Sequence, residues 1–451
     1  MSTIKLILSD LHLADGHSTL DCFGDRQQSA FDGLLSAACS SNPLGNAADV
    51  ELIINGDCFD FLVTSPYDTQ GATDNAIATR KLERIITSHR AFFATLRRFI
   101  ATNGRHVTFI TGNHDIELAL VKIQERITQE IAGVTEHPAI QFCLSRFYRP
   151  SSDVYIEHGN HYDFWNHSIE GLWDTQGQPL ATRPGTISLS VGSRYFQHAA
   201  HPISIVYPYF DHFEPSMNST RQIALLCMLD PEIVMETARQ TMLMLSEPQP
   251  ALVNLAPGEE YIPAKLFEHA MLDFATFQQD MANHKTDWMP PEGHDNEQAI
   301  GNAMVEFSML HDVLALPLIE AVAIICTPTT YQMGESVAAG LHTLLEHDPT
   351  LRYAIAGHTH MVRIDPMSSD TQFTQSYLNT ASWTPRFALP APGEVTPELV
   401  EWLRKPDWQH IPLRDVTQFI FAIVNTPTDG PSSASLCVWD GGLQGSYRVL
   451  A

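Results

Sequence analysis

Five short apolar runs, rich in β-branched residues, are spread along the chain, and each stops at a group of polar residues. The runs are IKLILS (4–9), VELIIN (50–55), HVTFIT (106–111), DVYIE (153–157) and LRYAIA (351–356). Short continuous apolar runs of this kind are typical of strands buried on both faces. We therefore predict five buried strands.

Helical patterns, with apolar residues three and four positions apart, lie between and after these runs. The clearest covers 74–104 and closes at Gly104, and three more cover 219–247, 262–284 and 296–326. Alternating strands and helices predict an α/β fold. Further strands are predicted within 373–385 and 418–450, where they would form part of a second sheet.

The longest stretch without a predicted strand lies between the fourth and fifth runs. Because this stretch is mainly helical, we predict a helical insertion or cap over 166–345, with the core formed by 1–165 and 346–451. Its most apolar part, residues 310–326, contains Asp312, Pro317 and Glu320. A membrane span needs about 20 predominantly apolar residues, so a buried cap helix is favoured over an interfacial membrane helix.

Charge narrows the range of partners. The 451-residue chain carries 52 acidic and 26 basic residues, a formal charge of −26, and has no Lys- or Arg-rich run. Such a field repels nucleic acid and anionic membranes unless bound cations offset it. Seven scattered cysteines without a Cys-x-x-Cys pair predict free thiols, and the amino terminus lacks the features of a signal peptide. We therefore expect a cytoplasmic protein.

The polar groups that end the five runs are the candidate chemistry. In α/β folds the carboxyl ends of strands form the ligand site, so these side chains are expected to converge. Imidazoles, carboxylates and an amide oxygen suit divalent Mn, Fe, Zn or Co, and the lack of cysteine among them favours an open catalytic site over a closed structural one. Two ions about 3.5–4 Å apart would share a bridging carboxylate, for which Asp57 is the candidate.

The ordered motifs SDLH, GDCFD, GNHD, HGN and GHTH resemble those of the calcineurin-like metallophosphoesterase superfamily. The resemblance implies a two-sheet β-sandwich flanked by helices and a site with two divalent ions, Mn first and Fe, Zn, Co or Ni as alternatives. It also implies that a hydroxide bridging the ions attacks phosphorus. The metal ligands implied are Asp10, His12, Asp57 and His360 for one ion, and Asp57, Asn113, His158 and His358 for the other.

By the same resemblance, three further residues support the reaction. His114 protonates the leaving oxygen or stabilises the transition state, Asp115 orients the imidazole of His114, and Asp60 holds ligands through hydrogen bonds. The expected activity is therefore that of a metal-dependent phosphoric ester hydrolase.

The substrate is left open by these motifs. We favour a small phosphodiester or pyrophosphate of nucleotide type over a phosphomonoester or phosphoprotein, a nucleic acid, or a non-catalytic role as a metal-binding interaction module. SDLHL and GDCFD are also similar to the UDP-2,3-diacylglucosamine pyrophosphatase branch, although the insertion is larger here and His114 replaces the usual arginine of that branch. A lipid or membrane contact through the insertion and a homo-oligomeric interface are further alternatives.

Overall fold

The structure of the chain is a computed structural model. It describes residues 2–16, 19–40, 44, 47–66, 72–163, 166, 172, 179, 185–217, 219–246, 316–326, 334–367, 373–440 and 446–450. The helix predicted over 262–284 lies outside these residues, as does most of the one predicted over 296–326.

The first of two large sheets has seven strands in the order β16-β15-β14-β1-β2-β4-β5. Its parallel half consists of β1 (Ser2–Leu8), β2 (Asp49–Asn55), β4 (Arg105–Ile110) and β5 (Ile140–Cys143). Its antiparallel half consists of β14 (Phe419–Pro427), β15 (Ser433–Trp439) and β16 (Tyr447–Val449). Three of the predicted strands, β1, β2 and β4, are therefore confirmed as neighbours.

The second sheet has five strands in the order β11-β12-β10-β7-β6. Its members are β6 (Phe147–Ser151), β7 (Val154–Glu157), β10 (Tyr353–Ala356), β11 (Val362–Met367) and β12 (Gln375–Thr380). The three central strands β7, β10 and β12 run parallel, and the two edge strands run antiparallel to them. The remaining two predicted strands, β7 and β10, thus lie in this sheet.

The two sheets pack on a shared apolar layer. In β1, Ile7 points into this layer, where Ile156 of β7 and Ile355 of β10 are also buried. Its neighbours Leu6 and Leu8 belong instead to the core beneath the helices. Both faces of β1 are therefore buried, which is why its sequence is a continuous apolar run rather than an alternating one.

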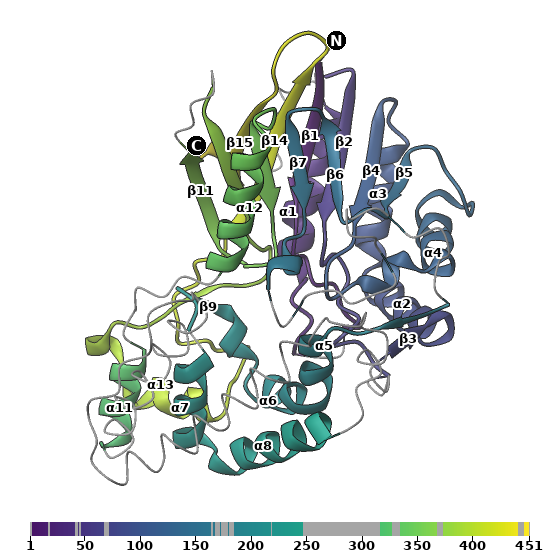
Figure 1. Cartoon of the computed structure of the whole chain (residues 1–451). Coiled ribbons are helices and arrows are strands. Elements are labelled where there is room, and N and C mark those ends of the chain that lie inside the picture. Colours follow the sequence, from purple (N-terminus) through teal and green to yellow (C-terminus); the bar gives the residue numbers. More distant parts are fainter. Residues whose placement is uncertain are drawn as a thin grey trace, which may run out of the picture.

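Helices cover the outer face of each sheet (Figure 1). The first sheet is covered by α1 (Asp25–Cys39), α2 (Asn75–Ser88), α3 (Arg90–Ile100) and α4 (Val121–Ala132), and the second by α12 (Glu335–His347). The pattern predicted as one helix over 74–104 is two helices separated at His89. At this break the His89 ring is buried, and its Nε2 lies 2.8 Å from Asp21 Oδ2.

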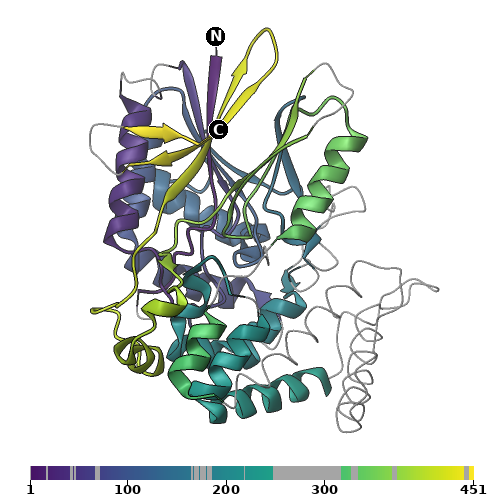
Figure 2. The same ribbon diagram turned by 90° about the vertical axis from the view of Figure 1, so that its left-hand side faces the viewer.

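A helical cap lies beyond the carboxyl ends of the central strands (Figures 1 and 2). Its helices are α5 (Val191–Tyr195), the π-helix η3 (Phe196–Ala200), α6 (His201–Val206), α7 (Ser219–Leu229), α8 (Pro231–Ser246), α11 (Leu318–Ile325) and α13 (Pro397–Arg404). Shorter elements complete the molecule: β3 (Ala72–Asp74) pairs with β8 (Thr186–Ser188), and the short helices are η1 (Ile116–Ala119), η2 (Asn160–Tyr162), η4 (Pro208–His212) and η6 (Pro392–Glu394).

The cap is assembled from two separate parts of the chain. Its apolar core joins Tyr209 and Leu225 of the insertion to Leu399 and Trp402 of α13. Strand β13 (Phe387–Ala388) also pairs with β9 (Phe213–Glu214). The prediction that all of 346–451 belongs to the core is therefore corrected, because a segment after β12 returns to pack on the insertion.

Helix α11 covers the described part of the apolar stretch considered as a membrane contact. Ala321, Val322 and Ile325 of this helix are buried in the cap core, as expected for a cap helix. Within the described ranges, no helix combines the length and the apolar character that crossing a membrane requires.

Trp383 links the two-sheet core to the loop after β1 and provides a test of the fold. Its buried ring packs on Phe31 and Phe419, its Nε1 donates to the Ile420 carbonyl at 2.7 Å, and its backbone N–H donates to the Asp10 carbonyl at 3.2 Å. Trp383→Ala should lower the free energy of unfolding by about 3–5 kcal/mol, because it opens a cavity. Trp383→Phe should cost roughly 1 kcal/mol from the lost hydrogen bond. Urea denaturation followed by circular dichroism measures both, and equal midpoints for Trp383→Ala and wild type would contradict this assignment.

Candidate metal centre

The five predicted polar groups meet at one edge of the two sheets. Asp10 and His12 follow β1, Asp57 and Asp60 follow β2, and Asn113 to Asp115 follow β4 of the first sheet. His158 follows β7, and His358 and His360 follow β10 of the second sheet. Since β1, β2 and β4 are parallel, as are β7 and β10, the carboxyl ends of each set share an edge.

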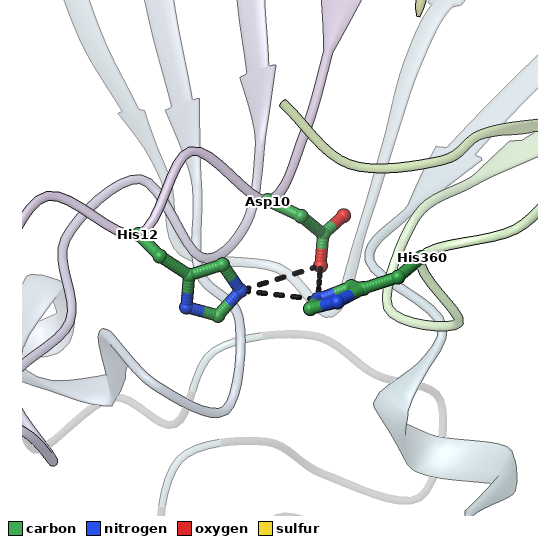
Figure 3. A group of neighbouring side chains, drawn as sticks. All are labelled: Asp10, His12 and His360. Atoms are coloured by element: carbon green, nitrogen blue, oxygen red, sulfur yellow. Dashed lines mark hydrogen bonds and ion pairs between the residues drawn. The ribbon is translucent and has the colours of Figure 1, made fainter. Parts of the chain in front are cut away.

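One group of possible metal ligands joins the first sheet to the second (Figure 3). His360 Nε2 lies 3.2 Å from Asp10 Oδ1 and 3.1 Å from His12 Nε2. His12 Nε2 lies 4.0 Å from the same Asp10 oxygen. The three ligand atoms therefore face a common point between the loops, as Figure 3 shows for the three side chains.

A second group contains Asp57, His158 and His358, whose ligand atoms all lie within 4.8 Å of one another. His158 Nε2 lies 3.1 Å from Asp57 Oδ2 and 3.2 Å from Asn113 Oδ1, so the amide of Asn113 faces this group as well. Asp57 Oδ2 also lies 3.9 Å from His12 Nε2 of the first group. One oxygen of Asp57 thus lies between the two groups.

The hydrogen bonds of two rings test whether these groups fit a cation. His158 Nδ1 lies 2.9 Å from the Asn55 carbonyl oxygen, which only accepts, so Nδ1 donates and Nε2 of the neutral ring carries a lone pair. His12 Nδ1 faces the Asp60 carboxylate at 2.9 Å in the same way. His158 Nε2 then points at the carboxylate of Asp57 and the amide oxygen of Asn113. Either a proton on this nitrogen or a metal ion can lie between these groups, and the set of carboxylate, amide and imidazole ligands suits a divalent ion.

The electric field at the second group is strongly negative. Although burial lowers it, the carboxylates of Asp57 and Asp10 raise the pKa of His158 to about 9. Although burial raises it, the imidazole of His158 holds the pKa of Asp57 well below its usual range. The buried carboxylates therefore attract positive charge, and a divalent ion competes with a proton for the His158 nitrogen.

The backbone at the predicted ligands is strained. Asp10, His12, Asp57, His358 and His360 have positive φ values of 55°, 51°, 51°, 68° and 58°, in the left-handed region that residues with a Cβ rarely adopt. Each such residue costs about 1 kcal/mol or more relative to an ordinary conformation. Such residues cluster at functional sites, so five of them at one place point to a functional site.

Two motif glycines allow the loops to approach this closely. A Cβ atom at Gly112 would overlap the carboxylate and backbone N–H of Asp57, and one at Gly357 would overlap Ser9 and the carboxylate of Asp10. The glycines of GNHD and GHTH therefore make room for ligand side chains from neighbouring loops.

Asp60, rather than Asp115, contacts the ring of His114. His114 Nδ1 lies 3.0 Å from Asp60 Oδ2, the same oxygen that faces His12 Nδ1. The other Asp60 oxygen accepts the backbone N–H groups of Leu62 and Val63, each at 3.1 Å. Asp60 is thus rigidly held between a predicted ligand and the predicted acid.

Asp115 has a different place in the structure. Its carboxylate accepts the backbone N–H of Gly112 at 2.7 Å and that of Cys58 at 2.8 Å, so it ties the loop after β4 to the loop after β2. Burial and the neighbouring Asp57 carboxylate raise its pKa to about 7. The contact that the sequence analysis expected of Asp115 is therefore made by Asp60, because Asp115 points at the backbone instead of the ring.

Asp163 was not among the predicted site residues. Its Oδ2 lies 3.1 Å from His358 Nε2, so the nitrogen of that ring left for a cation is Nδ1. Asp163 follows His158 by five positions, and the stretch HGNHYD was the available signal. Its role depends on a loop conformation that the sequence pattern does not specify.

Comparisons with known proteins add little. No family model matches the chain, and no curated protein matches it. Among solved structures, the chain is similar to the crystal structure of a dimetal phosphatase from Danio rerio, at 10% identity and a TM-score of 0.29, covering 100% of this chain and 98% of that one. A TM-score of this size carries no argument about fold or activity.

The close approach at Gly112 gives a test of the centre. Gly112→Ala should displace Asp57 and reduce the bound metal per chain severalfold after loading with Mn²⁺, because even changes outside the direct ligands alter metal affinity about 10- to 100-fold. Gly393→Ala is the matched control, since nothing lies within 4 Å of a Cβ at that position. Metal content is measured by inductively coupled plasma mass spectrometry on dialysed protein. Undiminished metal in a folded Gly112→Ala variant would contradict the placement of Asp57.

Proposed function

We propose that the protein is a dinuclear metal-dependent phosphoesterase of the metallophosphoesterase fold. The observation that carries this proposal is the oxygen of Asp57 that lies between two groups of largely buried Asp and His side chains. Under the proposal, Asp10, His12, Asp57 and His360 hold one divalent ion, and Asp57, Asn113, His158 and His358 hold the other. Imidazole, carboxylate and amide donors support Mn²⁺ as the first choice.

Bound divalent ions would neutralise the phosphoryl oxygens and lower the pKa of water. The residues of the chain supply the remaining functions. The ligand side chains fix the position of the phosphoryl group, and their burial excludes bulk water, which strengthens the electrostatic interactions there. Only 1% of the His158 side chain and 2% of the Asp57 side chain are exposed, so the centre is well shielded.

His114 is proposed to donate a proton to the leaving oxygen. Its Nδ1 is held by Asp60, so Nε2 is the nitrogen available to a substrate. The His114 side chain is 23% exposed, whereas that of His12, on which it packs, is 7% exposed. His114 is therefore the more accessible of the two rings to a substrate. Asp60 acts as a positioning residue, since it orients the rings of both His12 and His114.

The proposed substrate is a small phosphodiester or pyrophosphate of nucleotide type. The formal charge of −26 disfavours a polyanionic nucleic acid, whose backbone normally needs a basic groove. None of the seven cysteines is paired, which supports the cytoplasm as the compartment of the enzyme.

The first test combines metal analysis with a substrate panel. The Mn-loaded protein should contain about two ions per chain and should hydrolyse a phosphodiester and a nucleotide pyrophosphate faster than a phosphomonoester or a lipid-linked nucleotide. Asp57→Asn should lose metal and at least about 100-fold in kcat/KM, because it removes the shared ligand. Two ions with no hydrolysis of any substrate would contradict the proposal. Faster hydrolysis of the monoester would keep the enzyme class but overturn the proposed substrate.

The pairing of His114 with Asp60 is tested by a double-mutant cycle. His114→Gln should keep the metal content and lower kcat about 100-fold on a substrate with a poor leaving group, within the range typical of general acids. Adding Asp60→Asn to that variant should cost less than Asp60→Asn costs in the wild type, because only the contact of Asp60 with His12 is then left to lose. Adding Asp115→Asn should have an independent effect, so it is the matched control. Additivity of His114→Gln with Asp60→Asn, measured per metal-loaded chain, would refute the pair.

A further inference from the structure

One aromatic side chain of the cap lies against His114. The ring of Phe196, the first residue of η3, has its centroid 6.4 Å from that of His114 and is tilted by 58°. Phe196 is partly exposed and packs at the edge of the main core. The side of His114 that faces the cap is therefore bordered by a phenyl ring.

The position of Phe196 is held by neighbouring elements. The buried ring of His201, at the start of α6, lies edge-on to it at 5.8 Å. The hydroxyl of Thr237 in α8 donates a hydrogen bond to the Ala199 carbonyl at 3.4 Å, which links the η3 turn to α8. π-Helical turns are rare, and those that do occur are often found at functional sites. This one places Phe196 next to the proposed acid His114.

The side chains that pack on Phe196 from the cap present no charge to a ligand. Burial lowers the pKa of His201, so its ring is neutral at pH 7. Lys81 is also close enough to lower the pKa of His201. However, the Lys81 side chain is fully buried and donates to the Phe61 carbonyl at 2.6 Å, so its charge points into the protein. On the core side, the nearest charge to His114 is the Asp60 carboxylate.

We propose that Phe196, supported by His201, contacts the leaving group of the substrate and selects an aromatic leaving group over a non-aromatic one. The proposal rests on the proposed function, because it takes the His114 side of the centre as the side from which the leaving group departs. The two rings are too close for a third to fit between them, which would need about 7–8 Å. The leaving group therefore packs along their edges, an arrangement that aromatic pairs favour.

The test compares two methyl phosphodiesters of similar leaving-group acidity, one with a phenyl and one with a hexafluoroisopropyl leaving group. Wild type should prefer the phenyl ester about five- to tenfold in kcat/KM, the size of effect expected from one aromatic contact. Phe196→Ala should abolish this preference by slowing hydrolysis of the phenyl ester alone. Phe196→Tyr should keep the preference for the phenyl ester, because its side chain is still aromatic. Phe147→Leu, at a partly buried aromatic position on β6, is the control for general loss of packing.

Each outcome has a distinct meaning. If wild type with two ions bound hydrolyses neither ester and no nucleotide pyrophosphate, the proposed function fails and this inference fails with it. If it hydrolyses the pyrophosphate but neither ester, this inference alone is overturned. If wild type hydrolyses both, but the ratio between them is the same in Phe196→Ala, the phosphoesterase activity stands and the role of Phe196 is overturned. Metal content and circular dichroism on each variant separate a local effect from unfolding, and an equal loss on both esters would also overturn the selective role.

Discussion

The constraint on which the structure depends is that buried carboxylate, amide and imidazole groups from two different sheets face one another. Asp57 Oδ2 and Asn113 Oδ1 lie at hydrogen-bond distance from His158 Nε2, and the Asn55 carbonyl accepts a hydrogen bond from the opposite nitrogen of that ring. Buried carboxylates are unfavourable without positive charge close by. In the metal-free chain a proton on His158 meets this need, in keeping with the raised pKa of that ring, and a divalent ion can take the place of the proton. This gathering of possible ligand atoms makes the edge a candidate metal centre.

The rest of the fold can be understood as the support that this arrangement needs. Left-handed residues such as Asp10 and His360 are stable only when surrounding contacts determine their conformation. The apolar layer between the sheets fixes the positions of the strand ends. In addition, the backbone N–H of Trp383, in the loop after β12, donates to the Asp10 carbonyl. Gly112 leaves the space that Asp57 occupies. The cost in conformational energy is therefore offset by packing that lies outside the centre itself.

The sequence predicted what is encoded locally. Each strand and its terminal polar group lie within about ten residues, so periodicity and residue type were enough for the strands and for the residues that converge after them. It did not predict contacts between distant segments. Asp60 and Asp115 are both three or fewer residues from a ligand, and only the tertiary structure shows that Asp60 faces His114. For the same reason, α13 looked like part of the core until its contacts with Tyr209 placed it in the cap.

The cap and the metal centre are joined by a short length of chain. Arg386 lies three residues after Trp383 and directly before β13, and its Nη2 donates to Glu214 and Ser216 of the insertion at 3.0 Å each. Burial is the main cause that lowers the pKa of His212 of the cap and of His360 of the centre, and the buried Arg386 guanidinium lowers both further, so it is close to each. Trp383, which holds the loop at Asp10, and Arg386, which binds the cap, therefore lie on one short stretch of chain. Because of this continuity, the position of the cap and the geometry of the strand ends are set by one stretch of chain.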